Sequence, residues 1–148
     1  MKLERIQELW SEDAKIDRDR LDEESLKIPQ LHSKYYTLFS SERLTMKRME
    51  SDLDILKSQR YEFYDATISE EDLDERGWSE EFKNFGKKVL KSDIGRYLES
   101  DRYIIESNLK LALQKEKCLF LESILESIRF RSPSIKNAID FLRFTNGN

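Results

Sequence analysis

Two cations and two aromatic rings share one face of a predicted helix at residues 56–64, whose sequence is LKSQRYEFY. Lys57, Arg60, Tyr61 and Tyr64 follow one another at i, i+3, i+4 and i+7, which places their side chains along one side of a helix. Lysine and arginine pair with phosphates, and aromatic rings stack on unpaired bases. This face therefore has the residue types needed to hold a single-stranded nucleic acid.

The same four residues also have a purely structural explanation. At the edge of a packed helix, the rings would cover the core while the long cations extend along apolar surface to reach water. Arg60 also continues the apolar stripe that we expect to be buried along its helix. The pattern alone favours this explanation, and both interpretations stay open.

A second group of cations lies at residues 83–91, KNFGKKVLK. Its lysines Lys83, Lys87, Lys88 and Lys91 alternate with apolar residues, a pattern that usually marks a solvated face. If the two long helices of the chain close into a hairpin, this run lies near the end of the first helix. The two groups of cations could then form one basic surface.

The formal net charge of −4 is distributed unevenly along the chain. Residues 65–82 contain one cation, Arg76, and eight anions, whereas residues 83–103 contain six cations and three anions. A charged partner responds to the local field within about 10 Å, so the overall acidity does not exclude a polyanion. The acidic segment is most simply a solvated loop. A second hypothesis makes it a docking site for a basic partner or a screen against unwanted contact with DNA.

The composition excludes several classes of protein. The single His32 and the single Cys118 cannot form a zinc site or an intrachain disulfide. The chain has no glycine-rich phosphate-binding loop, and its carboxylates lie in charge-rich segments without a predicted apolar pocket. We therefore expect no enzymatic activity, no cofactor and no metal. No apolar run approaches the roughly 20 residues that cross a membrane, so we expect a soluble cytoplasmic protein.

The hydrophobic periodicity predicts an all-α protein, and the four glycines and two prolines provide few turns for a β fold. We expect a single domain, residues 1–148, built on a long antiparallel helical hairpin. The expected elements are an N-terminal helical arm at 1–29, a helix at 30–64, an acidic then basic connector at 65–91, a helix at 92–130 and a short C-terminal helix at 132–145.

Two local patterns refine these boundaries. Ser69 followed by Asp72 predicts a helix that starts after Ser69. Ser132 followed by Pro133 predicts that the last helix starts there, with Ser132 as its N-cap. The second long helix is expected to carry apolar residues on one face, at Leu98, Ile105, Leu109, Ala112 and Leu119, and on an adjoining stripe, at Leu113, Phe120, Ile124 and Ile128.

The last helix carries more apolar surface than a hairpin would cover. Phe141 and Phe144 add to an apolar stripe that follows helical spacing. The helix therefore either folds back onto the hairpin or meets other copies of the chain. The residues that we expect in such an assembly are Ile128, Ile135, Ala138, Ile139 and Leu142.

The chain resembles the UvsY-type recombination mediator proteins of tailed bacteriophages in two blocks and in overall length. The first block runs from Ser33 to Tyr64, and the second is the C-terminal end. The matching residues are Ser33, Lys34, Ser40, Ser41, Glu50, Leu53 or Ile55, Arg60, Phe63 and Tyr64 in the first block, and Arg131, Ile135, Lys136, Asp140, Phe144 and Gly147 in the second.

This resemblance implies a ring-like homo-oligomer of six or seven subunits, assembled through the C-terminal helix, in the cytoplasm of the host cell. It implies binding to single-stranded DNA without sequence preference, to the phage recombinase and to the phage single-stranded-DNA-binding protein. It also implies that the protein helps the recombinase to displace that binding protein. The alternative is a helical adaptor or assembly subunit that binds proteins without contacting DNA.

The resemblance also implies a DNA-binding motif at the end of the first long helix. Leu56, Arg60 and Tyr64 match that motif, but Ser58 stands where the family has a lysine. Lys57 lies one position earlier, about 100° round the helix. A long lysine side chain could still reach the same phosphate.

Overall fold

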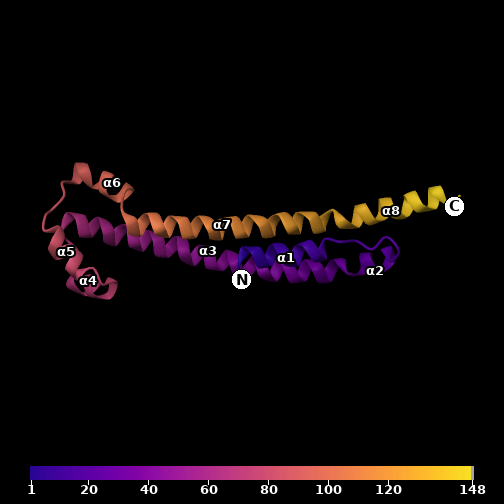
Figure 1. The fold of residues 1–148 in the computed structure, drawn as a ribbon, viewed down its shortest axis with the longest axis horizontal. Helices are drawn as coiled ribbons and strands as arrows, with labels where there is room; N and C mark the ends of the chain where they lie inside the picture. The colour runs from indigo at the N-terminus through magenta and orange to yellow at the C-terminus, as the bar shows by residue number, and fades with distance from the viewer. Residues whose placement is uncertain (148) are drawn as a thin grey trace. The chain divides into compact units, whose positions relative to one another are not determined.

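The computed structural model describes residues 1–147, which form eight α-helices and no strand (Figure 1). The predicted all-α fold class is confirmed. Within these residues, no helix combines the length and the apolar character required to span a membrane. The helices are α1 (Leu3–Asp13), α2 (Leu21–Leu26), α3 (Ile28–Asp65), α4 (Glu70–Arg76), α5 (Ser79–Phe85), α6 (Lys91–Glu99), α7 (Arg102–Arg129) and α8 (Arg131–Thr145).

The described chain divides into two compact units, and the expectation of a single domain stays a prediction. Unit 1 contains Met1–Thr45 and the chain from Gln114 onward, and unit 2 contains Met46–Leu113. Each unit includes a segment of α3 and a segment of α7. Within each unit these two segments run antiparallel, as the predicted hairpin requires (Figure 1).

In unit 1, the N-terminal arm is ordered as two helices. Ile6 of α1 and Tyr35 of α3 are completely buried. The rings of Trp10 and Tyr35 pack in a T-shaped arrangement, with their centroids 5.4 Å apart. Further along α3, the buried carboxylate of Glu42 accepts a 2.7 Å hydrogen bond from the side-chain amide of Gln114. The arm therefore packs as part of the unit.

The start of α8 is fixed by a buried arginine and not by a serine cap. Arg131 donates a 3.0 Å hydrogen bond to the Lys15 carbonyl and pairs with Glu24 at 3.2 Å, which ties α8 to the arm. The predicted start at Ser132 is therefore wrong, because α8 begins at Arg131 without a side-chain cap. Pro133 is tolerated because backbone N–H groups in a first helical turn have no intrahelical partner.

In unit 2, the connector between the long helices folds into two short helices. Ser69 accepts a 3.1 Å hydrogen bond from the Asp72 backbone N–H, so the predicted helix start at Ser69 is confirmed. Gly77 then ends α4 with a φ of 73°, a left-handed conformation that favours glycine. The side chain of Trp78, which follows, is almost fully buried against Phe63 of α3.

The second long helix is broken, which corrects the prediction of one helix at 92–130. α6 ends at Glu99, and α7 begins at Arg102. Between them, the Asp101 carboxylate accepts a 3.1 Å hydrogen bond from the Ile104 backbone N–H and so acts as the N-cap of α7. The chain therefore changes direction at Asp101 (Figure 1).

Of the two predicted apolar stripes of α7, the structure leaves the first largely exposed and buries part of the adjoining one, at Ile124 and Ile128. Ile105, Leu109 and Leu119 are exposed, as is Leu113 on the predicted adjoining stripe. Asp101 and Ile104 are both buried, which sets the rotation of the helix at its start. The buried residues of α7 are Ile104, Leu111, Gln114, Cys118, Leu121, Ile124 and Ile128.

Candidate nucleic-acid interface

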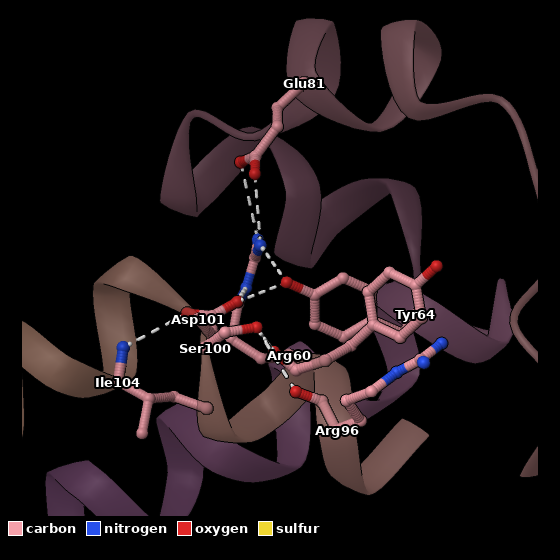
Figure 2. A network of polar contacts seen from close by, with 8 residues as sticks. Arg60, Tyr64, Glu81, Arg96, Ser100, Asp101 and Ile104 are labelled. Atoms are coloured by element: carbon pink, nitrogen blue, oxygen red, sulfur yellow. Dashed lines mark hydrogen bonds and ion pairs between the residues drawn. The ribbon is translucent and has the colours of Figure 1, made fainter. Parts of the chain in front are cut away.

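Arg60 of α3 is a core residue of unit 2, with only 2% of its surface exposed. Its Nε donates a 2.7 Å hydrogen bond to Asp101, and its two terminal nitrogens donate to the two carboxylate oxygens of Glu81 at 3.1 and 3.4 Å. Figure 2 shows the guanidinium between these two carboxylates. We call the set of Arg60, Tyr64, Glu81 and Asp101 the Arg60 network.

Tyr64 completes the Arg60 network one helical turn further along α3. Its hydroxyl donates a 2.6 Å hydrogen bond to the same Asp101 oxygen that Arg60 contacts, and it accepts a 3.3 Å bond from Arg60 (Figure 2). Burial and the bond to Asp101 raise the pKa of Tyr64 to about 12. Burial alone would lower the pKa of Arg60, but the bonds to Asp101, Glu81 and Tyr64 raise it. Arg60 is therefore held charged, and Tyr64 is held protonated.

Aromatic rings surround the guanidinium of Arg60. Its central carbon lies 4.1 Å from the centroid of the Phe63 ring, 4.7 Å from that of Trp78 and 4.8 Å from that of Tyr103. A cation within about 6 Å of an aromatic centroid is attracted to the face of the ring, more strongly where water is excluded. Arg60 therefore joins α3 to the α4–α5 connector and to the start of α7.

The predicted DNA-binding face of α3 is thus divided by the structure. Arg60 and Tyr64 are buried in the core of unit 2, so their polar groups are not accessible to a DNA strand. Lys57 is exposed, and Tyr61 is half-buried. DNA contact at these positions stays a prediction, and the geometry fits it only at Lys57 and Tyr61.

The basic run after α5 is placed at the surface of unit 2. Lys83, Lys87, Lys88 and Lys91 are all exposed, and so is Arg96 of α6, which the sequence analysis missed. Among residues 1–147, none of these five cations forms an ion pair with a carboxylate. We call these five residues the basic surface. The sequence signal for Arg96 was its position five residues after Lys91 in a short, highly charged segment.

The basic surface adjoins the end of α3 and aromatic rings that the sequence analysis did not connect with it. The backbone N–H of Val89 donates a 2.8 Å hydrogen bond to the Tyr64 carbonyl, which fixes the α5–α6 loop against α3. Lys87 lies over the rings of Phe85 and Tyr97, with its Nζ 5.4 and 5.5 Å from their centroids. The sequence therefore correctly predicted that the basic run would lie near the end of the first long helix.

The acidic segment forms helix as well as loop. Glu81 is its one carboxylate that enters the Arg60 network, and its side chain remains 42% exposed. Arg76 donates a 2.7 Å hydrogen bond from its Nε to the side chain of Gln59, which attaches α4 to α3. The carboxylates of α4 are all exposed or half-buried, so this helix presents a negative face.

Of the residues that we expected to contact other copies of the chain, only some are exposed. Ile128 and Ile135 are buried within unit 1, and Ala138 and Ile139 are half-buried there. Leu142 is exposed. The two phenylalanines that lie beside this stripe, Phe141 and Phe144, are 65% and 82% exposed. The free apolar surface of α8 is thus at its C-terminal end.

Comparisons with known proteins find relatives along almost the whole chain. The family described as "Recombination, repair and ssDNA binding protein UvsY" matches residues 9–148. The chain is 26% identical over 147 residues to the recombination protein uvsY of Enterobacteria phage T4, with 99% of each chain covered.

Crystal structures of the bacteriophage T4 recombination mediator protein UvsY are similar in fold. One has a TM-score of 0.76 at 22% identity and covers 98% of this chain and 99% of its own. Another crystal form has a TM-score of 0.77 at 23% identity, with 99% and 98% covered. At these identities the structures support the fold.

The Arg60 network predicts unequal costs for removing its two carboxylates. Asp101→Asn leaves a buried guanidinium without its inner partner, so we expect the free energy of unfolding to fall by about 3 kcal/mol. Glu81→Gln removes a half-exposed partner and should cost about 1 kcal/mol or less. Urea denaturation of both variants measures the difference. Equal costs would show that Asp101 is not the main support of Arg60.

Proposed function

Because the chain belongs to the UvsY family of recombination, repair and single-stranded-DNA-binding proteins, we propose that it is a recombination mediator. It binds single-stranded DNA without sequence preference as a homo-oligomer. It helps to load a strand-exchange recombinase onto DNA that is covered by single-stranded-DNA-binding protein. The observation that carries this proposal is the basic surface, whose five exposed cations have no carboxylate partner among the described residues of unit 2. Two of them, Lys87 and Arg96, lie beside aromatic rings.

We assign the proposed contacts to DNA to cations that are exposed at the surface of unit 2. The five residues of the basic surface bind phosphates, and Lys57 adds one further cation on α3. Arg60 and Tyr64 support this surface from the core, since the backbone N–H of Val89 in the α5–α6 loop donates a hydrogen bond to the Tyr64 carbonyl. Contacts to phosphates carry no sequence information, which fits binding without sequence preference.

A single subunit with five or six cations binds one strand weakly at physiological salt. Several subunits that hold one strand together bind it more tightly, with gains on the order of a hundredfold. We therefore propose that assembly and DNA binding are linked. The ring presents one strand across successive basic surfaces and leaves stretches of it open to the recombinase.

The proposed assembly surface is the end of α8 together with an apolar groove of unit 1. Phe141 and Phe144 are large apolar side chains that the chain itself leaves uncovered. The groove, about 800 Å³ in volume, is lined by α3 and α7 residues that include Pro29, Tyr36 and Leu125. Because the two surfaces differ, their contact is head-to-tail, which closes into a ring when the rotation allows.

The proposed protein partners are the phage recombinase and the phage single-stranded-DNA-binding protein, and the proposed site of action is the cytoplasm of the host cell. The negative face of α4 is the surface that we assign to a basic patch of one of these partners. We propose no catalytic step: the protein acts by binding and positioning.

A protein-only adaptor is the second candidate function. The exposed apolar residues Ile105, Leu109 and Leu113 of α7 favour it, because apolar residues that follow one helical face suit contact with another protein. Such an adaptor would not bind DNA even at low salt.

We predict that binding to single-stranded DNA depends on salt and on the basic surface. Fluorescence anisotropy with a labelled thymidine oligomer should show affinity falling between about 50 and 200 mM salt, with a slope of about −0.7 per phosphate contacted. Lys88→Ala/Lys91→Ala should flatten that slope by about 1.4 and weaken binding.

The matched control is Arg5→Ala/Lys15→Ala, which removes the same charge from exposed positions in unit 1. This control should bind as the wild type does. A control that is as damaging as the Lys88/Lys91 variant would contradict a localised DNA-binding surface, and a lack of binding at 50 mM salt would favour the adaptor.

We predict that the exposed end of α8 is needed for assembly. Phe141→Ser/Phe144→Ser should give smaller particles in light scattering and weaken DNA binding on the order of a hundredfold, because the strand loses its multiple contacts. Leu44→Ser is the control, since Leu44 is 67% exposed on α3 and lies outside the proposed contact. Particles of full size in the double variant would rule out this assembly surface.

A further inference from the structure

Tyr97 of α6 is the aromatic residue most closely surrounded by the basic surface. Its side chain is half-buried in unit 2. The Nζ of Lys87 lies 5.5 Å from the centroid of its ring and donates a 3.2 Å hydrogen bond to its hydroxyl. The guanidinium of Arg96 lies 5.7 Å from the same centroid. One aromatic ring therefore has two exposed cations beside it.

Both cations can move away from the ring at low cost. Neither Lys87 nor Arg96 pairs with a carboxylate among the described residues, and a cation–π contact at an exposed site is weak. Long side chains of this kind can turn toward phosphates while their stems stay in place. A base that arrives at the Tyr97 ring would therefore displace flexible side chains and not a packed core.

The other side of Tyr97 is rigidly supported. Its ring centroid lies 5.3 Å from that of Tyr64 and 6.1 Å from that of Phe85. Tyr64 is itself fixed by the 2.6 Å hydrogen bond to Asp101 in the Arg60 network. The platform is thus ordered before any ligand arrives, which reduces the entropy lost on binding.

No other ring of the surface combines these features. Phe85 lies 5.4 Å from Lys87, but it also packs against Phe63 and Tyr64 in the core. Tyr61 is half-buried, and no cation lies over its ring among the residues that the structure describes. Of these three rings, Tyr97 is the one that joins a half-buried side chain, two exposed flanking cations and a fixed backing.

We propose that Tyr97 is a stacking platform for one base of a bound single strand, with Lys87 and Arg96 holding the phosphates on either side of that base. This inference rests on the proposed single-stranded-DNA binding and adds a contact to the base itself. Stacking on an aromatic face does not depend on base identity, so the platform distinguishes unpaired bases from a duplex without reading sequence.

The test compares two labelled strands of equal length, a thymidine oligomer and an oligomer whose sugar–phosphate backbone carries no bases. Wild-type protein should bind the thymidine oligomer about tenfold more tightly, since one stacked base contributes on that order. Tyr97→Phe keeps the ring and should preserve this preference. Tyr97→Leu should remove most of it while leaving the salt slope unchanged, because the cations remain.

Phe130→Leu is the matched control, because it removes an exposed aromatic ring from unit 1 at a position that does not line the proposed assembly groove. It should behave as the wild type does. A strand with one 2-aminopurine base provides a second readout: its fluorescence should fall on binding to wild type and to Tyr97→Phe, and much less on binding to Tyr97→Leu. Circular dichroism checks the fold of each variant. If Tyr97→Leu unfolds, the proposal is tested by the other two proteins: wild type and Tyr97→Phe should both prefer the strand with bases and both quench 2-aminopurine.

Equal affinity of the wild type for both strands would overturn the platform while leaving phosphate binding by the basic surface intact. A folded Tyr97→Leu variant that keeps the preference for bases would also overturn it. Absence of binding to either strand at about 50 mM salt would overturn the proposed function and the platform together.

Discussion

The buried ion pair between Arg60 and Asp101 determines how unit 2 is built. Burying two charges is costly unless their geometry is good and their remaining hydrogen-bonding groups are satisfied. Here Arg60 reaches Asp101 at 2.7 Å, and the same carboxylate also accepts bonds from Tyr64 and from the Ile104 backbone. These bonds require the chain to turn at Asp101, so one ion pair explains the break between α6 and α7, the rotation of α7 and the position of Tyr64.

The same constraint separates the cations that hold the fold from those that are free to bind. Arg60 is enclosed by two carboxylates and four aromatic rings, so its charge is already satisfied inside the protein. The basic surface lies outside this network, and its cations have no carboxylate partner in the described chain. The network connects the two through Tyr64, which fixes the α5–α6 loop by its carbonyl and supports Tyr97 by its ring. A rigid core thus positions exposed cations, which is the arrangement that the proposed binding to DNA without sequence preference requires.

Much of the fold was predictable because the deciding signals are local. Helical periodicity predicted α3 as 30–64 against the observed Ile28–Asp65, and the side chain of Ser69 marked the start of α4. The break at Asp101 was not predictable in this way, since its N-cap role depends on an arginine 41 positions away. The sequence did indicate that Arg60 could be buried, because Arg60 continues the apolar stripe of α3. For the candidate site, the lysines were predicted from composition, but Arg96 and Tyr97 required knowledge of where α6 lies.

Hydrogen exchange with and without a saturating thymidine oligomer tests the central claim most directly: the strand lies on the basic surface, and the Arg60 network stays closed. Lys87, Lys88 and Leu90 lie between α5 and α6, outside regular structure, and their backbone N–H groups donate no backbone hydrogen bond among the described residues, so these amides should exchange quickly in the free protein. DNA should slow exchange in peptides that cover 83–97 and leave those of α4 unchanged. Protection confined to the N-terminal arm, with residues 83–97 unaffected, would contradict the account.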